Sequence, residues 1–265
     1  MTQYDKIARY YDVVFGEVYP YDAEVKMLHR LFQKYGAGRV LDVTCGTGNH
    51  LVRLAALGYE CAGSDISSGM VAMAKAKAGK KGFKIDFYQN DVKQLTIPRT
   101  FDAVISLYGL PFTLLPECVN PSLQVMLEGF RKALRGIYRV LEPGGIFIFN
   151  MMNPAATIQS PGYGPWSESN VHGKQVNKTK IVLMNKIQRS GNLLNFKDIY
   201  LVQDREVSLE VLRYRAFLLS LEQVKPILTA TGFRVEAVYS NLATLSEFGG
   251  ESLDMTIVSS REIMN

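Results

Sequence analysis

The chain has 265 residues, of which 47% are hydrophobic and 21% charged, with a formal net charge of +5. This hydrophobic content supports a complete core and excludes a largely disordered chain. No apolar stretch approaches the roughly 20 residues of a membrane-spanning helix, so we expect no membrane partner. Basic residues are spread along the sequence, which argues against a nucleic-acid groove.

The first residues and the cysteines indicate the cellular compartment in which the protein is found. Residues 1–6 are polar and mixed in charge, unlike a secretion signal. The three cysteines, Cys45, Cys61 and Cys118, are odd in number and lack the spacing of metal ligands. We therefore expect a cytoplasmic protein without a bound metal.

Residues 1–36 are predicted to be helical and are rich in tyrosine. For any single tyrosine here, ordinary packing of an amphipathic helix on the core is the simplest interpretation. Tyr11 and Tyr21 differ because they lie near breaks in the helical pattern, where a side chain can face a binding site.

The most informative pattern lies between residues 39 and 65. Residues 39–43 form a short apolar run that is typical of a buried parallel strand. A glycine loop, a helix that ends at Gly58 and a second strand that leads to Asp65 follow it. Strand, glycine loop, helix, strand and acid together are typical of the nucleotide-binding half of a doubly wound sheet.

Details of this pattern restrict the cofactor. Leu51 stands where a dinucleotide fingerprint has a third small residue, and Asn49 and His50 replace the Lys-Ser/Thr pair of a phosphate-binding loop. Asp42 would repel a pyrophosphate but attract a cationic amino-acid group, and Asp65 could accept bonds from ribose hydroxyls. These features favour S-adenosylmethionine and argue against the rival interpretation, a nicotinamide oxidoreductase.

The alternation of strands and helices continues to about residue 150. The expected elements are a helix from Ser67 or Ser68 to about residue 77, strands at residues 84–88 and 101–106, a helix opened by Asn120 and Pro121 that ends near residue 140, and a fifth strand at residues 146–149.

Several segments of this region resemble the class I S-adenosylmethionine-dependent methyltransferases. Residues 40–48 are similar to the first motif of that family, although Thr44 stands where Gly or Ala is usual. Residues 90–92 match its adenine-binding segment, and residues 101–106 and 141–149 match its fourth strand and the turn into its fifth. The resemblance covers residues 38–150. It implies an α/β fold, a doubly wound Rossmann-like sheet of seven strands closed by an antiparallel hairpin.

The resemblance also implies a cofactor site for S-adenosylmethionine, with S-adenosylhomocysteine as the product. In the family, the N-terminal helices lie over the cofactor as a lid, which brings in the two tyrosines named above. Met70 is equally consistent with a core position. The expected cofactor-binding residues are Tyr11, Tyr21, Asp42, Thr44, Gly46, Gly48, Asn49, Asp65, Ile66, Met70, Asn90, Asp91, Val92 and Ser106.

Residues 151–219 interrupt the alternation. Residues 152–170 are rich in Pro, Gly and Ser and are predicted to be a long loop, and three strands are expected at residues 179–188, 193–202 and 207–216. This arrangement predicts a small antiparallel sheet inserted after strand five. The chain then divides into a lid (1–36), a core (37–150), the insertion (151–219) and a final helix with the closing hairpin (220–265).

Methyl transfer requires positioning of a nucleophile and exclusion of water, so a dedicated catalytic residue need not exist. The carboxyl ends of strands four and five place Tyr108 and Asn153 near the reaction, where they could orient an acceptor or serve only in loop hydrogen bonds. The histidines His29, His50 and His172 are expected at surface or hydrogen-bonded positions.

The insertion resembles those of glycine N-methyltransferases and amino-sugar N,N-dimethyltransferases. We therefore expect an S-adenosylmethionine-dependent methyltransferase with a small-molecule acceptor, an amine. The alternatives are a non-catalytic S-adenosylmethionine-binding protein and a methyltransferase acting on RNA or protein. Arg213 and Arg215 either place a cation near the acceptor or are ordinary surface charges. A homodimer is left open.

Overall fold

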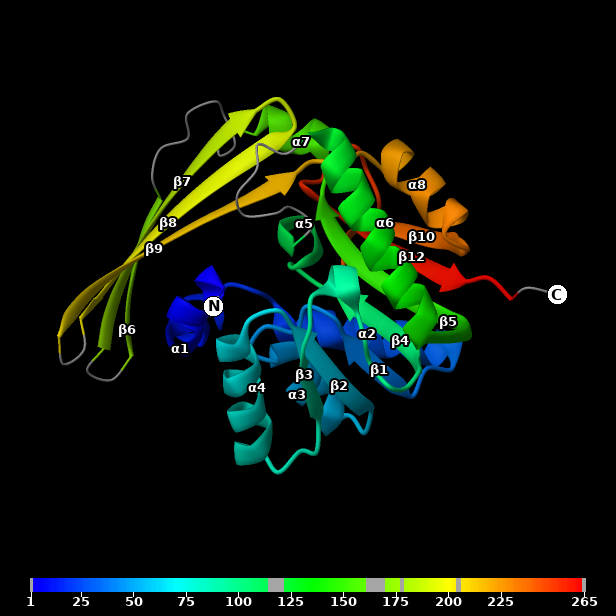
Figure 1. Ribbon diagram of the computed structural model, residues 1–265, viewed down its shortest axis with the longest axis horizontal. Coiled ribbons are helices and arrows are strands. Elements are labelled where there is room, and N and C mark those ends of the chain that lie inside the picture. The colour runs from blue at the N-terminus through cyan, green and yellow to red at the C-terminus, as the bar shows by residue number, and fades with distance from the viewer. Residues whose placement is uncertain (1, 114–121, 161–169, 177–178, 204–205, 264–265) are drawn as a thin grey trace.

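The computed structural model describes residues 2–113, 122–160, 170–176, 179–203 and 206–263 (Figure 1). Its central sheet has the strand order β11-β10-β12-β5-β4-β1-β2-β3. The strands are β1 (Arg39–Asp42), β2 (Glu60–Asp65), β3 (Asp86–Gln89), β4 (Phe101–Ser106), β5 (Leu141–Met152), β10 (Phe233–Asn241), β11 (Ser246–Glu247) and β12 (Asp254–Arg261).

The five strands from β5 to β3 are parallel, and β12 and β10 are antiparallel to their neighbours. This confirms the doubly wound α/β sheet with an antiparallel C-terminal part. The sheet has eight strands rather than the expected seven because the two-residue strand β11 pairs with β10. So short an edge strand has no alternating pattern from which it could be predicted.

Helices cover both faces of this sheet. The described helices are α1 (Gln3–Phe15), α2 (Tyr21–Tyr35), α3 (Asn49–Ala56), α4 (Ser68–Lys80), the 3₁₀ turn η1 (Val92–Gln94), α5 (Leu110–Thr113), α6 (Leu123–Val140), α7 (Pro154–Gln159) and α8 (Leu221–Ala230). One apolar cluster joins the sheet to α6 and α8, and a second joins its other face to α2, α3 and α4. None of the described helices is long and apolar enough to cross a membrane.

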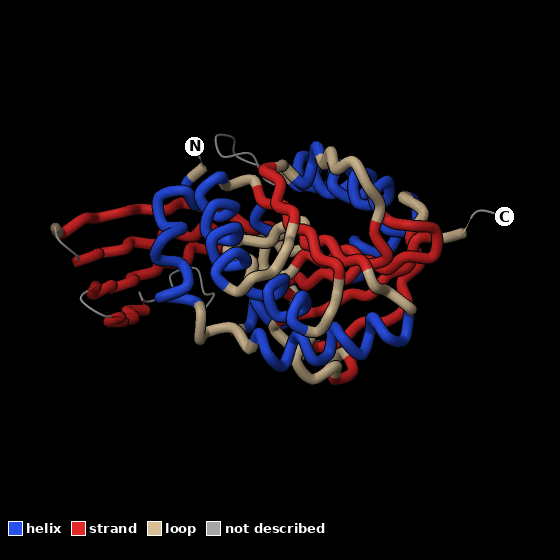
Figure 2. The backbone as a smooth tube through the Cα atoms, turned by 90° about the horizontal axis from the view of Figure 1, so that it is seen from below, coloured by secondary structure: helices blue, strands red, loops and turns tan. Residues whose placement is uncertain are grey.

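A second, antiparallel sheet follows β5. It contains β6 (Asn170–Val176), β7 (Thr179–Ser190), β8 (Leu193–Gln203) and β9 (Val207–Phe217), in that order. Figure 2 shows these strands projecting from one end of the molecule. Alternate residues of β8 are buried, so one face of the sheet packs on α1 and α5. We call this the inner face.

Two differences from the expected insertion stand out. The sheet has four strands rather than about three, because an additional strand, β6, begins at Asn170, the last residue of the expected loop. Within that loop, residues 154–159 form the helix α7, with Pro154 in its first turn, where proline is tolerated. Asn120, Pro121 and Cys118 lie outside the described residues, and Ser122 caps the described part of α6.

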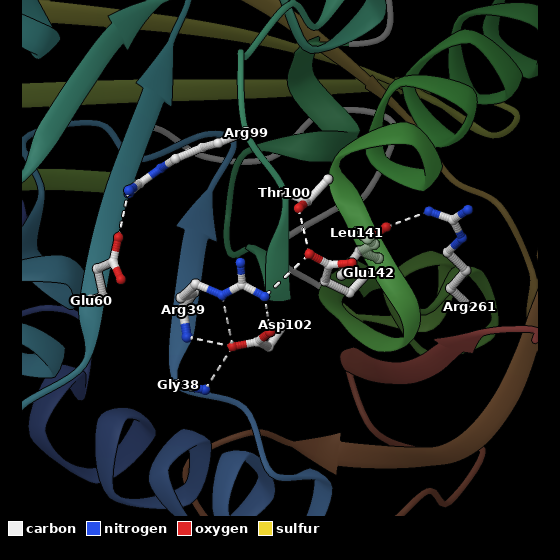
Figure 3. Close-up of polar contacts among 9 residues, drawn as sticks. All are labelled: Gly38, Arg39, Glu60, Arg99, Thr100, Asp102, Leu141, Glu142 and Arg261. Carbon is white, nitrogen blue, oxygen red and sulfur yellow. Dashed lines mark hydrogen bonds and ion pairs between the residues drawn. The ribbon is translucent and has the colours of Figure 1, made fainter.

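Polar contacts join the amino-terminal ends of the central parallel strands, at the opposite end of the sheet from their carboxyl ends (Figure 3). Asp102 accepts bonds from the backbone N–H groups of Gly38 and Arg39 at 3.0 and 2.8 Å, and from the Arg39 guanidinium at 2.7 Å. The same guanidinium reaches Glu142 at 3.2 Å. These bonds fix β1, β4 and the start of β5 relative to one another, and therefore also position their other ends.

Candidate functional site

The site lies at the point of the central sheet where the strand order reverses direction. The chain runs outward from β1 through β2 to β3 and then returns to place β4 on the other side of β1. The connections diverge at this point and leave a crevice beyond the carboxyl ends of the two strands, the usual ligand position in such sheets. Thr44 and Ser106 span the crevice with a hydroxyl–hydroxyl distance of 2.8 Å.

The glycine loop after β1 takes a conformation that requires glycine. Gly46 and Gly48 have φ angles of 51° and 78°, in the left-handed region. The N–H of Gly46 donates to Asp65 Oδ2 at 2.9 Å, and the N–H of Ser67 donates to Asp65 Oδ1 at 2.9 Å. Asp65 is therefore fixed between the loop and the start of α4, and burial raises its pKa.

Asp42, the last residue of β1, is the second carboxylate of the site and is buried, with 2% of its surface exposed. Its Oδ1 accepts the N–H of Thr44 at 3.1 Å. Burial raises the pKa of Asp42 to about 7, Asp65 adds to the shift, and His50 and the bond from Thr44 oppose it. A cation bound at Asp42 would favour its ionised form.

Two adjoining pockets open around these acids. The Asp42 pocket, about 340 Å³ including its open mouth, is lined by Tyr11, Tyr19, Tyr21, Asp42, Thr44, Cys45, Gly46, Thr47, Asn49, His50, Leu107 and Tyr108. The Asp65 pocket, about 530 Å³ including its open mouth, is lined by Tyr4, Tyr11, Thr44, Gly46, Asp65, Ile66, Met70, Leu107, Tyr108, Gly109 and Phe112. Because they share five lining residues, they form one elongated cleft with a carboxylate in each half.

The helix α1 is attached to α4 by Asp5. Its Oδ1 accepts bonds from the Ser67 hydroxyl at 2.6 Å and the Gly69 N–H at 2.7 Å, so it caps α4 from another helix. Burial alone would raise the pKa of Asp5, but bonds from Ser67, Gly69 and Thr2 lower it to about 2. This attachment holds the tyrosines of α1 over the cleft.

A second attachment joins α1 to the glycine loop. Asp12 accepts a bond from the Thr47 hydroxyl at 2.6 Å and from the Asn49 amide at 3.0 Å, and pairs with Lys77 at 2.8 Å. The Lys77 ammonium also donates to Asn49 Oδ1 at 2.6 Å. The amide of Asn49, expected to contact the cofactor, thus serves this cluster, although Asn49 still lines the Asp42 pocket.

A buried network lies beside the Asp42 pocket. Glu24 on α2 is 2% exposed, contacts His50 Nε2 at 2.9 Å and accepts a hydrogen bond from the Tyr108 hydroxyl. Tyr108 has a φ of 59°, which is uncommon for a residue other than glycine, and its N–H donates to Asn150 Oδ1 at 2.7 Å. Its ring stacks on Tyr19, with centroids 4.2 Å apart. Both the backbone and the ring of Tyr108 are therefore fixed.

Comparison with known proteins identifies the domain that carries this cleft. Residues 40–145 match the family described as methyltransferase domain. The chain carries a class I S-adenosylmethionine-dependent methyltransferase domain. S-adenosylmethionine is the methyl donor of this class, and no group of three or more His, Cys, Asp or Glu that could hold a metal occurs among the described residues.

The relatives of the methyltransferase domain include amine methyltransferases. A glycine/sarcosine N-methyltransferase of Aphanothece halophytica is 35% identical over 134 residues, which are 49% of this chain and 46% of that protein. The chain spans about half the length of the curated relatives it matches.

Solved structures are similar over nearly the whole chain. A S-adenosylmethionine-dependent methyltransferase from Clostridium acetobutylicum has a TM-score of 0.77 at 16% identity and covers 98% of this chain and 99% of its own. A sugar N-methyltransferase from Streptoalloteichus sp. has a TM-score of 0.73 at 22% identity, with 94% and 90% covered. At these identities the similarity concerns the fold.

The structure brings most of the expected cofactor-binding residues to the cleft. Those lining one or both pockets are Tyr11, Tyr21, Asp42, Thr44, Gly46, Asn49, Asp65, Ile66 and Met70. Gly48 packs against Ala74 of α4 instead, and Ser106 reaches the cleft only through its bond to Thr44.

The expected adenine-binding segment lines neither pocket. The Asn90 side chain bonds to the backbone of Thr96, at 3.1 Å to its carbonyl and 3.2 Å to its N–H. Asp91 caps η1 and pairs with Lys93 at 3.4 Å. Val92 is 2% exposed and packs in the core cluster with α6. These side chains support the loop, and their contact with a cofactor stays a prediction.

Of the two catalytic candidates, only Tyr108 lies in the cleft. Asn153 caps α7 through a bond from the Ala155 N–H at 3.3 Å, and its amide donates to the carbonyls of Gly250 and Ser252 at 2.9 and 2.8 Å. Its polar groups are therefore used within the fold, and it lines neither pocket. Its role in orienting an acceptor stays a prediction, and these contacts favour the alternative, a loop hydrogen-bonding role against the segment before β12.

Other polar residues singled out from the sequence have ordinary roles. His29 contacts the Tyr59 hydroxyl at 2.7 Å, and His50 pairs with Glu24, so both are hydrogen-bonded. The backbone of Arg213 bonds to the Gln3 side chain, and its own side chain is exposed. The side chain of His172 lies outside the described part of the structure.

Glu24 and Asp12, whose contacts support the cleft, were not predicted from the sequence. Glu24 occupies a buried position between Tyr21 and Leu28 on the apolar stripe of α2. An acid at the i+3 position of such a stripe is a recognisable signal, because a buried carboxylate needs a partner. Asp12 carries no such signal, since its partners Thr47 and Lys77 belong to elements far along the chain.

Proposed function

We propose that this protein transfers a methyl group from S-adenosylmethionine to a small-molecule acceptor, and that the acceptor is an amine. The observation that carries the proposal is the pair of carboxylates, buried Asp42 and half-buried Asp65, one in each half of the cleft at the switch point of the sheet. The two alternatives are a binding protein without turnover and a methyltransferase that acts on RNA or protein, and each predicts a different result in the turnover experiment.

The lining of the cleft fits S-adenosylmethionine. Asp42, once ionised, attracts the ammonium of the methionine part, and Asp65 can accept bonds from ribose hydroxyls with the lone pairs that its backbone donors leave free. Ile66 and Met70 give the Asp65 pocket an apolar wall suited to an adenine ring. The left-handed Gly46 lets the backbone approach the ligand closely.

The bound cofactor supplies an electrophilic methyl group on a sulfonium, and the protein orients the nucleophile and excludes water. Tyr4, Tyr11 and Tyr19 enclose the cleft from the N-terminal segment. Tyr108 stands at the end of β4 in both pockets, with its hydroxyl held by Glu24, so it gives the acceptor a fixed wall. No residue of this set has to act as a base, because an amine can release its proton to solvent.

The chemistry of the cleft and the relatives support an amine. The pocket walls contribute carboxylates and aromatic rings, which suit a cationic or amino-bearing ligand. The glycine/sarcosine N-methyltransferase and the sugar N-methyltransferase both have names that describe methylation of nitrogen. The second sheet packs behind Tyr4 and Phe112 of the cleft wall through Tyr214, and this backing favours a compact acceptor over a polymer.

Binding is tested first by calorimetry with S-adenosylhomocysteine. Loss of the Asp65 carboxylate in Asp65→Ala should weaken binding by roughly 1–3 kcal/mol, about 5- to 150-fold. Asp86→Ala is the matched control, since Asp86 lies on the edge strand β3 with a largely exposed side chain. Binding of NAD(H) by the wild type, with none of S-adenosylhomocysteine, would contradict the proposal.

Turnover is tested with S-adenosylmethionine labelled in the methyl group and a panel of primary amines, phenols and small acids. Transfer to amines supports the proposal. Tight cofactor binding without transfer to any small molecule, RNA or protein would favour the non-catalytic alternative, and transfer to RNA or protein alone would favour a polymer acceptor.

A further inference from the structure

Asp198 is a buried acid outside the cofactor site. It lies at the centre of β8 on the inner face, opposite Asn185 of β7 and Leu212 of β9, and is 2% exposed. Its neighbours on the same face of β8, Phe196 and Tyr200, are also buried. A carboxylate in such a position costs folding free energy unless its lone pairs find donors.

The hydrogen bonds of Asp198 are incomplete. Its Oδ2 accepts the Tyr214 hydroxyl at 2.8 Å, but its buried Oδ1 has no partner among the described residues. The side-chain oxygen of Asn185, on the neighbouring strand, also lacks a partner among them. These two buried acceptor oxygens lie at paired positions of one sheet. A ligand with several hydrogen-bond donors could satisfy both of them.

One layer of aromatic rings separates Asp198 from the cleft. The ring of Tyr214 lies 5.6 Å from that of Phe112 and 6.1 Å from that of Tyr4, centroid to centroid. Phe112 and Tyr4 both line the Asp65 pocket. Tyr214, and Asp198 to which it is hydrogen-bonded, therefore lie directly behind the wall of the pocket, and a ligand that reaches Asp198 requires Tyr4 or Phe112 to turn aside.

The electrostatics suit a cation. Burial raises the pKa of Asp198 to about 6, and the bond from Tyr214 opposes the shift. Burial is also the main cause of the raised pKa of Tyr4, and the charge of Asp198 is the next cause, so the field of Asp198 reaches the wall of the cleft. An ionised carboxylate beneath aromatic faces is a favourable environment for an ammonium.

We propose that Asp198 and Tyr214 form the acceptor-binding subsite and select acceptors that carry a protonated amino group. This inference rests on the proposed function, because it assigns the acceptor end of the same cleft. The three N–H donors of an ammonium can satisfy the free oxygens of Asp198 and Asn185 together, and the rings of Tyr4 and Phe112 are placed to contact its hydrocarbon part. The ammonium is the form that binds; its nitrogen attacks the methyl carbon only after it has released one proton to solvent. Asp198 here is a binding residue that positions the acceptor.

The test measures binding without turnover. The complex with S-adenosylhomocysteine is titrated by calorimetry with glycine, ethanolamine and glucosamine, each paired with its N-acetyl derivative, in which the nitrogen is uncharged. At least one amine should bind ten times or more tightly than its derivative. In Asp198→Asn, which keeps the size of the side chain, this preference should fall below about twofold while the affinity for S-adenosylhomocysteine stays within twofold. Asp86→Asn should retain the preference.

A second readout needs no variant. The carboxyl carbon resonance of Asp198, assigned in ¹³C-labelled wild type, should shift when the same amine is added and should not shift with its N-acetyl derivative. If Asp198→Asn does not fold, this titration decides alone. An unchanged amine preference in Asp198→Asn, or no response of the Asp198 resonance to any of the three amines, would overturn the subsite.

The failure of this inference can be separated from failure of the proposed function. Methyl transfer to amines with the same KM in wild type and Asp198→Asn overturns the subsite and leaves the proposed function intact. A responding Asp198 resonance without methyl transfer to any amine supports the subsite but contradicts the proposed reaction.

Discussion

Asp12 of α1 and Lys77 of α4 form an ion pair, with 2.8 Å between Oδ2 and Nζ, and both side chains hydrogen-bond to Thr47 in the glycine loop. Burial lowers the pKa of Lys77, and Asp12 opposes the shift by stabilising the ammonium. A single contact therefore joins the N-terminal segment, the loop and α4. The geometry of the cleft depends on a helix that lies before the methyltransferase domain in sequence.

We predict that Asp12→Ala weakens binding of S-adenosylhomocysteine by about 5- to 50-fold, because charge-assisted bonds to two cleft-forming elements are lost. Calorimetry measures the affinity, and hydrogen exchange of residues 2–15 reports the detachment of α1. Asp22→Ala is the control: Asp22 also belongs to the N-terminal helices and pairs with Arg53 at 2.6 Å, but its side chain is 90% exposed. Equal effects of the two variants would refute a specific role for Asp12.

The pKa of Asp42 predicts how cofactor affinity depends on pH. Burial raises it from an ordinary 3.8 to about 7, so the folded protein without ligand keeps a proton on Asp42 between those values. An ammonium ligand requires the ionised form, and affinity for S-adenosylhomocysteine should rise up to about tenfold per pH unit until pH reaches about 7. Calorimetry from pH 5 to 8 tests this. Asp42→Asn should bind weakly and with a flatter profile, and an unchanged slope in that variant would contradict the assignment.

The same shift has a consequence for stability. Between pH 4 and 7 the folded state binds more protons at Asp42 than the unfolded state does, so its contribution to the free energy of unfolding falls as pH rises through this window. Urea denaturation at pH 4.5 and 7 should show a smaller decrease in Asp42→Asn than in the wild type. A larger decrease in the variant would show that the pKa is not raised.

Local patterns were sufficient to predict the nucleotide-binding half. The apolar run of β1, the glycines 46 and 48, and the acids Asp42 and Asp65 all lie between residues 39 and 65, and their spacing determines a strand, a loop, a helix and a second strand. The strands β7, β8 and β9 were predicted for the same reason, since their residues alternate and a glycine turn separates two of them.

Contacts between distant segments could not be predicted in this way. The position of Asn153 directly after a strand predicted that it faces a binding site. In the structure its amide donates hydrogen bonds to two carbonyls about 100 residues later in the chain. No sequence pattern identified Asp198 as a buried acid with a partner. Its partner Tyr214 comes close to it only because of the register in which β8 and β9 pair. Sequence spacing records neighbours along the chain, whereas these roles depend on neighbours across a sheet or between helices.

The loop after β4 offers a steric prediction. A Cβ added at Gly109 would overlap the Thr44 side chain, which lines both pockets, whereas one added at Gly79 of α4 would meet nothing within 4 Å. Gly109→Ala should therefore displace Thr44 and weaken binding of S-adenosylhomocysteine by tenfold or more. Gly79→Ala should leave the affinity unchanged and raise the melting temperature slightly, because alanine favours a helix. Wild-type affinity in Gly109→Ala would show that the loop can move freely.

The role of Asn153 can be tested against its earlier interpretation as an acceptor-orienting residue. Asn153→Ala removes the cap of α7 and the two hydrogen bonds to the carbonyls of Gly250 and Ser252, so it should cost about 2–4 kcal/mol of unfolding free energy. Ser122→Ala is the matched control, because Ser122 caps α6 with one exposed bond and its loss should cost only about 0.5–1 kcal/mol. Urea denaturation measures both. At a temperature where Asn153→Ala remains folded, its KM for an amine acceptor should equal that of the wild type, since its side chain does not reach the cleft. A raised KM in a fully folded Asn153→Ala variant would show that Asn153 does contribute to the acceptor site.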